Sequence, residues 1–232
     1  MVKIGFIGAY DKTYFIIQIA KLLTSVGKKV LVIDSTISQK AKYIIPVIKP
    51  TKTYITEFEE MDVAVGFKSF EQIKNYLGME DNIEQNYDYE LIDIDDSETF
   101  NGFNMESARI NYFVTSFDLY SLKRGLEILS GLTCTQRLTK VLFSNSMNRD
   151  DDEYLNFLSE TYDIMWNQDK IYFPLDQGDS TAIIENQRAS KIKFKNLTQD
   201  YRESLLYVTE QILGDNSINT LRKNMRNIDK GV

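Results

Sequence analysis

The opening of the chain constrains its fold more than any other segment. Lys3–Ile7 is a short, mostly apolar run, and Gly8–Asp11 interrupts it. Lys12–Val26 then carries apolar residues at helical spacing, which predicts an amphipathic helix. Val30–Ile33 is a continuous apolar run that is followed by Asp34, as expected of a strand covered on both faces of a parallel sheet. The segment is therefore predicted to form a β-loop-α-β unit.

The same alternation continues along the chain and predicts an α/β fold. Further strand candidates are Tyr89–Ile94, Ile110–Thr115, Thr139–Ser144 and Lys170–Phe173. Helical patterns lie around Leu119–Leu129, Asp151–Glu160 and Ser180–Gln187, and a longer one spans Leu197–Leu213. Strands that alternate with helices favour a three-layer, doubly wound and mostly parallel sheet.

The segment between the second and third of these strands is less regular. Its pattern predicts an edge hairpin, with strand candidates at Tyr43–Ile48, Tyr54–Phe58 and Val63–Phe67, and a short helix at Ser69–Leu77. Because the chain shows no repeat and no Pro, Gly or Ser linker, we expect one domain over residues 1–214.

Composition excludes several classes of protein. The 232 residues contain no histidine, so neither a Ser-His-Asp triad nor a histidine-ligated metal site can form. Cys134 is the single cysteine and cannot close an internal disulfide, which suits a reducing compartment. The net charge of −7 and the pI near 4.8 oppose broad non-specific DNA binding, so protein or small-molecule partners are expected. Charges interrupt the apolar N-terminal stretch, so it resembles neither a signal peptide nor a membrane span, and we expect a cytoplasmic protein.

The tail, residues 215–232, follows the predicted domain and has a pattern of its own. Ile218, Leu221, Met225 and Ile228 recur at helical spacing among basic residues, which predicts a basic amphipathic helix. Such a helix can lie on an anionic membrane at the inner face of the cell. Because the tail is short and lacks aromatic residues, docking on the domain or on a partner, or disorder, is favoured over membrane contact.

Polar residues follow several of the predicted strands, where ligands bind in open α/β sheets. Gly8–Thr13 follows the first strand, Asp34 ends the second, Asp93 lies in the third and Asn145 follows the fifth. A Lys-Thr pair that opens a helix after a glycine-containing turn presents an ammonium to phosphates and a hydroxyl to magnesium. Each residue also has a structural interpretation: an ordinary helix start, a helix cap or turn, or a loop residue.

In their order along the chain, these elements resemble the ParA/MinD family. Gly8…Lys12-Thr13 is followed by the helix, by the second strand ending in Asp34 and by the third strand with Asp93. That family comprises P-loop ATPases with a deviant Walker A motif (SIMIBI class) that position plasmids, division sites, flagella, pili and secretion machines. The likeness extends through Ser144-Asn145 and Phe173-Pro174 to the closing helix, and so implies a P-loop NTPase fold for most of the chain.

The resemblance implies roles for individual residues. Gly8 and Asp11 belong to the phosphate-binding loop, Lys12 is its phosphate-binding lysine, and Thr13 supplies the magnesium hydroxyl. Asp93 is the Walker B acid and a magnesium ligand, and Asp34 is the first acid of a catalytic pair. Asn145 is placed where the family often reads the adenine edge, and the loop after Pro174 packs beside the base.

Three positions depart from the family pattern. The signature lysine that reaches a phosphate across the dimer interface is replaced by Ile7, the glycine before the P-loop lysine by Asp11, and the second acid after the second strand by Thr36. The first and third changes remove a transition-state cation and a water-positioning acid. Asp11 brings a like charge to the phosphates, at a cost of about 3 kcal/mol for a 5 Å separation and an effective dielectric near 20. We therefore expect ATP and Mg²⁺ to bind weakly or not at all.

These observations favour a degenerate ParA/MinD-like positioning or assembly factor for a pilus, secretion, conjugation or partition machine, with weak or no ATP hydrolysis. Its expected partners are proteins of that assembly and a second copy of the chain in a homodimer. An active ATPase with an unusual P-loop is the first alternative. A metabolic ligase or reductase on a related fold is the second, and is disfavoured because no substrate constellation is visible.

Overall fold

The computed structural model describes residues 1–47, 51–78, 86–132, 135–144, 149–214 and 217–231. Within these ranges eight strands form one sheet. They are β1 (Val2–Ile7), β2 (Val30–Asp34), β3 (Tyr54–Phe58), β4 (Met61–Val65), β5 (Tyr89–Ile94), β6 (Ile110–Ser116), β7 (Gln136–Ser144) and β8 (Ile164–Pro174). The sheet is the frame on which the candidate site is built.

The strand order is β3-β4-β2-β5-β1-β6-β7-β8, and every neighbouring pair is parallel except the β3–β4 hairpin. β5 pairs with both β1 and β2, so that Asp93 lies opposite Phe6 on one side and Asp34 on the other. The carboxyl ends of the parallel strands meet at one edge, which we call the carboxyl edge. The opposite one is the amino edge.

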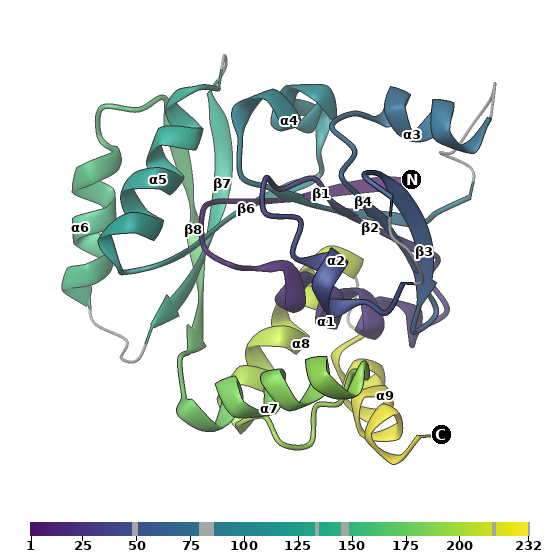
Figure 1. The fold of residues 1–232 in the computed structure, drawn as a ribbon. Helices are drawn as coiled ribbons and strands as arrows, with labels where there is room; N and C mark the ends of the chain where they lie inside the picture. Colours follow the sequence, from purple (N-terminus) through teal and green to yellow (C-terminus); the bar gives the residue numbers. More distant parts are fainter. Residues whose placement is uncertain (48–50, 79–85, 133–134, 145–148, 215–216, 232) are drawn as a thin grey trace.

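Helices cover both faces of the sheet (Figure 1). One face packs against α1 (Thr13–Thr24), α2 (Ala41–Ile44), α7 (Gln177–Ala189), α8 (Gln199–Leu213) and α9 (Ile218–Lys230). The other packs against α3 (Phe70–Leu77), α4 (Ser97–Gly102), the 3-10 turn η2 (Met105–Ser107), α5 (Leu119–Ser130) and α6 (Arg149–Ser159). Successive side chains of a strand point to opposite faces, so a strand such as β1 contributes Phe6 to one apolar core and Ile7 to the other. The predicted three-layer, mostly parallel α/β fold is confirmed.

The hairpin region contains one wrong prediction. Tyr54–Phe58 is strand β3 as predicted, but the strand expected at Tyr43–Ile48 is absent: residues 41–44 form helix α2, and Ile48 lies outside the described residues. The backbone N–H of Ala41 donates to Asp34 Oδ2 at 2.8 Å, which holds the chain in a turn. Pro46 then ends the helix, because it excludes the helical conformation for the preceding residue.

Two other elements differ from the sequence prediction. β8 begins at Ile164, well before the predicted start at Lys170. It pairs with β7 both before and after an irregular segment, and the predicted strand covered only the second half. Helix α4 was not predicted. It begins after Asp96, whose carboxylate accepts a hydrogen bond from Thr99 N at 2.6 Å and caps the helix.

The tail contains the helix α9, whose apolar side faces the domain. Leu221 and Met225 are buried in the core that α1 and α8 also line, and Ile218 and Ile228 pack against it. Asn224 Nδ2 donates to Ser25 O at 2.7 Å. A membrane could reach this apolar side only after α9 had left the domain. Among the described residues, no helix is long and apolar enough to cross a bilayer.

Candidate functional site

A loop joins β1 to α1 at the carboxyl edge, and its first residue must be glycine. Gly8 has φ +143°, and a Cβ at this position would lie 2.2 Å from the carbonyl oxygen of Val114 in β6. Its N–H donates to Ile94 O, at the end of β5, at 3.1 Å. The loop therefore starts from a fixed position between the ends of β5 and β6.

Lys12, Thr13 and Asp93 meet at the base of this loop. Lys12 Nζ lies 2.8 Å from Asp93 Oδ1 and donates to the carbonyl of Gly8 at 2.7 Å. Thr13 Oγ1 donates to Asp93 Oδ2 at 2.9 Å. All three side chains are buried, with Lys12 only 2% exposed. Residues about eighty positions apart in the sequence thus form one ion-paired, hydrogen-bonded cluster.

This cluster has the donor set of a magnesium-phosphate site. A hydroxyl and a carboxylate suit Mg²⁺, which commonly takes one or two protein oxygens and completes its shell with water and substrate phosphates. Within the described ranges, no group of three or more acidic or cysteine side chains could hold a metal ion alone. A magnesium ion here would therefore depend on a phosphate ligand.

Asp11 lies at the mouth of the loop and is paired on both sides. Asp11 Oδ1 accepts a long hydrogen bond from Thr13 N at 3.4 Å, in the first turn of α1. Asp11 Oδ2 forms an ion pair of 2.8 Å with Lys40 Nζ, and both side chains are about half exposed (49% and 45%). A helix N-terminus attracts anions through its free N–H groups and its dipole. The chain's own carboxylate thus lies at the N-terminus of α1, where an external anion would otherwise be attracted.

Asp34 ends β2 in a buried, closed hydrogen-bond arrangement. Its Oδ1 accepts from Thr36 N at 3.1 Å and from Thr36 Oγ1 at 2.6 Å, and its Oδ2 accepts from Ala41 N. Burial, with a further contribution from the charge of Asp93, raises the pKa of Asp34 to about 6. Both carboxylate oxygens are therefore engaged by the chain's own loop.

The acidic segment after β5 is partly neutralised by a lysine that follows the end of β4. Lys68 Nζ contacts Asp96 Oδ2 at 2.8 Å, Thr99 Oγ1 at 3.1 Å and the carbonyl of Ser35 at 2.7 Å. Burial opposes ionisation of Asp96, but the Lys68 and Thr99 hydrogen bonds outweigh it and lower its pKa. Burial is the main cause that raises the pKa of Asp95, although Ile37 N donates to it.

The remaining predicted residues lie farther along the carboxyl edge. Pro174 ends β8, three strands away from β1 in the sheet order, and pairs with Ser144 of β7. Asn145 lies outside the described residues. Tyr10, in the loop, stacks on Phe143 with ring centroids 4.7 Å apart, and Phe143 stacks on Phe173 at 5.0 Å. This aromatic column connects the loop to the ends of β7 and β8.

Besides Lys12, two lysines of this edge were not selected from the sequence. They are Lys40 and Lys68, which belong to the hairpin region, where the sequence pattern is less regular. The available signal was their position a few residues after predicted strands, the same criterion that selected Asp34. Their neighbours Asp11 and Asp96 come from other parts of the chain, so the pairing itself had no local signature.

Comparison with solved structures identifies the fold. The ParA-family ATPase of Chlorobium tepidum superposes with a TM-score of 0.58 at 13% identity, covering 90% of this chain and 98% of the other. The MinD cell division protein of Aquifex aeolicus superposes with a TM-score of 0.57 at 12% identity, covering 93% and 98%. The chain has the ParA/MinD fold. No protein-family model matches the sequence, and no curated protein matches it either.

Related structures show what other proteins of this fold bind. A variant of Cyanothece McdA, solved in complex with ATP, superposes with a TM-score of 0.56 at 13% identity and covers 92% of this chain and 96% of its own. The Aquifex MinD in complex with MinC superposes with a TM-score of 0.55 at 12% identity, covering 93% and 97%. At these identities the likeness establishes the fold and its connectivity.

Proposed function

We propose that this chain is a degenerate ParA/MinD-like protein that acts as a positioning or assembly factor for a cellular machine, with weak or no ATP hydrolysis. The observation that carries the proposal is the carboxylate of Asp11 at the N-terminus of α1, 3.4 Å from Thr13 N. It is a resident anion in the position where ATP phosphate would bind, so nucleotide must compete with the chain's own charge.

The residues that would hold ATP and magnesium are Lys12, Thr13 and Asp93. Bound nucleotide would supply the phosphoryl group, and Lys12 would have to exchange its contacts with Asp93 and Gly8 O for a phosphate oxygen. Lys12 is already buried and paired, so binding a phosphate means giving up these contacts. The exchange therefore contributes less binding free energy than a phosphate contact with an unpaired lysine would. The arrangement supports weak binding.

The positions that the family uses for turnover support poor hydrolysis. Ile7 is fully buried in the core on the α3–α6 side of the sheet, where it stabilises the fold and offers no cation. Thr36 donates its hydroxyl to Asp34 at 2.6 Å, so the residue in place of the second acid binds the first. The chain therefore has no cation at position 7 and no carboxylate at position 36, the two positions from which the family acts on the transition state.

Exposed apolar side chains at the carboxyl edge support a role in assembly. Ile37 follows β2, and Leu119 and Tyr120 follow β6, with Tyr120 70% exposed. Large apolar residues at a functional edge are typical of protein-protein contacts. We propose that a protein partner or a second copy docks there, and that dimerisation depends little on ATP because position 7 is not a lysine. Light scattering with and without ATP and Mg²⁺ tests this, and a clean ATP-driven shift from monomer to dimer would contradict it.

The direct test of the proposed function combines calorimetric titration of ATP and Mg²⁺ with a phosphate-release assay. We expect weak or undetectable binding and release near background. The competing candidate is an active ATPase with an unusual P-loop, and one contact favours it: the Lys40–Asp11 ion pair of 2.8 Å brings a second cation to the loop. Robust release that is lost in Lys12→Ala would establish that candidate.

Two further features belong to this proposal. We propose residues 1–214 as the ParA/MinD-like domain and residues 215–232 as its basic amphipathic tail. We also propose that the protein works in the cytoplasm, and that contact of its tail with the inner face of the membrane is the less favoured arrangement.

A further inference from the structure

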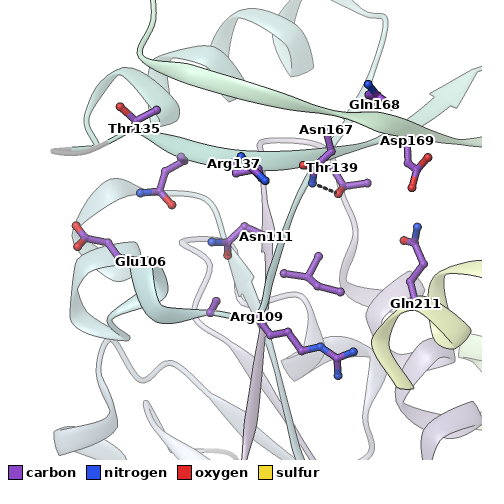
Figure 2. Close-up of a pocket in the computed structure, with 13 residues that line it drawn as sticks. Glu106, Arg109, Asn111, Thr135, Arg137, Thr139, Asn167, Gln168, Asp169 and Gln211 are labelled. Carbon is purple, nitrogen blue, oxygen red and sulfur yellow. Dashed lines mark hydrogen bonds between the residues drawn. The ribbon is translucent and has the colours of Figure 1, made fainter. Parts of the chain in front are cut away.

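A polar cavity of about 850 Å³ opens at the amino edge of the sheet, opposite the edge that carries the P-loop. It lies between the beginnings of β6 and β7, the middle of β8 and the last turn of α8 (Figure 2). Figure 2 shows Arg109, Arg137 and Asp169 around the opening, with Gln211 of α8 facing them. The function proposed above does not use this cavity.

A bulge in β8 shapes one wall of the cavity. Leu138 pairs with Trp166 but Lys140 pairs with Lys170, so two steps along β7 oppose four along β8. Residues 167–169 oppose Thr139 alone, leave the regular pairing and line the cavity. Asn167 Nδ2 donates to Thr139 Oγ1 at 2.7 Å, which holds the bulge against β7 (Figure 2). Bulges commonly re-aim side chains next to binding sites.

Two arginines give the cavity a cationic side. Arg109 Nη1 donates to the backbone carbonyl of Ile212 at 3.1 Å, which fixes its guanidinium beside the end of α8. Arg137 is exposed and lines the cavity (Figure 2). In the part of the chain that the structure describes, neither arginine forms an ion pair with a carboxylate. The lining also contains two carboxylates, Glu106 and Asp169, so the positive charge is confined to the side of the cavity that the two arginines form.

The other residues that line the cavity restrict which class of ligand it could bind. The volume is within the range of small-molecule sites, roughly 300–1,000 Å³, but those are mostly apolar. Here the lining includes the amides of Asn111, Asn167 and Gln211, and no aromatic ring lines it among the described residues. A nucleobase would therefore find no aromatic ring to stack on, whereas hydroxyl groups would find donors and acceptors. Planar guanidinium groups recognise oxyanions through paired hydrogen bonds.

We propose that this cavity binds a small, hydroxylated oxyanion, of the class of a sugar phosphate. Arg137 pairs with the phosphate, and Asn167, Gln211 and Asp169 hydrogen-bond the hydroxyl groups, whereas Asn111 already donates to Met105 O at 2.9 Å. The carboxylates of Glu106 and Asp169 disfavour a ligand with several negative charges, so a phosphate monoester fits better than a polycarboxylate.

The test titrates glucose 6-phosphate into the full-length protein by calorimetry, with inorganic phosphate, citrate and glucose as comparison ligands. The experiment is done in wild type and in Lys12→Ala, because the P-loop is a second place for a phosphate. We expect saturable binding of glucose 6-phosphate in both proteins, weaker binding of phosphate and citrate, and no binding of glucose. Arg137→Gln should weaken binding about tenfold or more, since a hydrogen bond to a charged group is lost.

Arg124→Gln is the matched control, because Arg124 is a partly exposed arginine on α5 that pairs with Glu127 and lies outside the cavity. It should bind glucose 6-phosphate as wild type does, and Arg137→Gln should keep the wild-type unfolding temperature. Asn167→Ala should also weaken binding if the bulge contributes. The proposal is overturned if none of the three anions binds, if glucose binds as well as its phosphate, if Arg137→Gln leaves affinity unchanged, or if Lys12→Ala abolishes binding.

Discussion

Replacing Asp11 tests most directly whether the chain's own carboxylate opposes nucleotide. A full charge about 5 Å from a phosphate charge costs about 3 kcal/mol at an effective dielectric near 20. Asp11 is 49% exposed and its Oδ2 lies 2.8 Å from Lys40 Nζ, so solvent and the ion pair both reduce this repulsion. With an effective dielectric near 60 the cost is about 1 kcal/mol, or about fivefold in Kd. We expect Asp11→Asn to strengthen binding of ATP and Mg²⁺ by that factor, and Asp11→Gly by somewhat more.

Calorimetric titration at moderate ionic strength measures this effect, and Asp200→Asn, on the exposed first turn of α8, is the matched control. Combining Asp11→Asn with Lys40→Gln shows whether Lys40 acts by neutralising Asp11 or by attracting the nucleotide itself. If Lys40 only neutralises Asp11, Lys40→Gln weakens binding in wild type and has little effect in Asp11→Asn. An unchanged Kd in both Asp11 variants would refute the view that this carboxylate obstructs the site. Phosphate release should remain near background in all of these variants, because none restores a cation or an acid for turnover.

Three further predictions concern the scaffold around the site. Gly8→Ala should lower the free energy of unfolding by about 2 kcal/mol or more in urea titrations, because its φ of +143° is strained for alanine and the Cβ would meet Val114 O at 2.2 Å; a change near zero would show that the loop relaxes freely. Asp34 has a folded-state pKa of about 6, above its ordinary value of 3.8, so the folded protein holds the proton of this carboxyl group more tightly than the unfolded chain does. This stabilises the fold fully below pH 3.8, and the stabilisation is lost as the pH rises through 6. Relative to Asp34→Asn, wild type should therefore gain about 1.4 kcal/mol between about pH 7.5 and about pH 5, and a pH-independent difference between the two unfolding free energies would contradict the raised pKa. Asp152→Ala leaves Lys140, which is 4% exposed and 2.7 Å from the carboxylate, without its ion-pair partner. It should cost about 3 kcal/mol, and equal stability of the variant and wild type would argue that α6 is held by apolar packing alone.

The elements most accurately predicted from sequence are those with purely local causes. β5 has the predicted bounds, and β1 and β2 differ by a residue at one end, because short, mostly apolar runs between turn residues are typical of strands covered on both faces. The failures lie where a distant contact outweighs local preference. Tyr43 lies in α2 because the Asp34 carboxylate accepts a hydrogen bond from the backbone N–H of Ala41. β8 begins earlier than predicted because β7 pairs with β8 on both sides of the bulge in β8.

The candidate site divides in the same way. The order of Gly8, Lys12, Thr13 and Asp93 along the chain leads to the hypothesis of a phosphate-binding loop, and the tertiary structure brings Lys12, Thr13 and Asp93 together. The ion pair of Lys40 with Asp11 and the turn of Thr36 toward Asp34 depend on side-chain geometry. Parallel pairing brings strand ends to one edge, but the partner of each charge is set by loop conformation and exposure, which no local pattern encodes. The amino-edge cavity is likewise a product of tertiary structure, because a bulge in one strand and the end of a distant helix together leave it open.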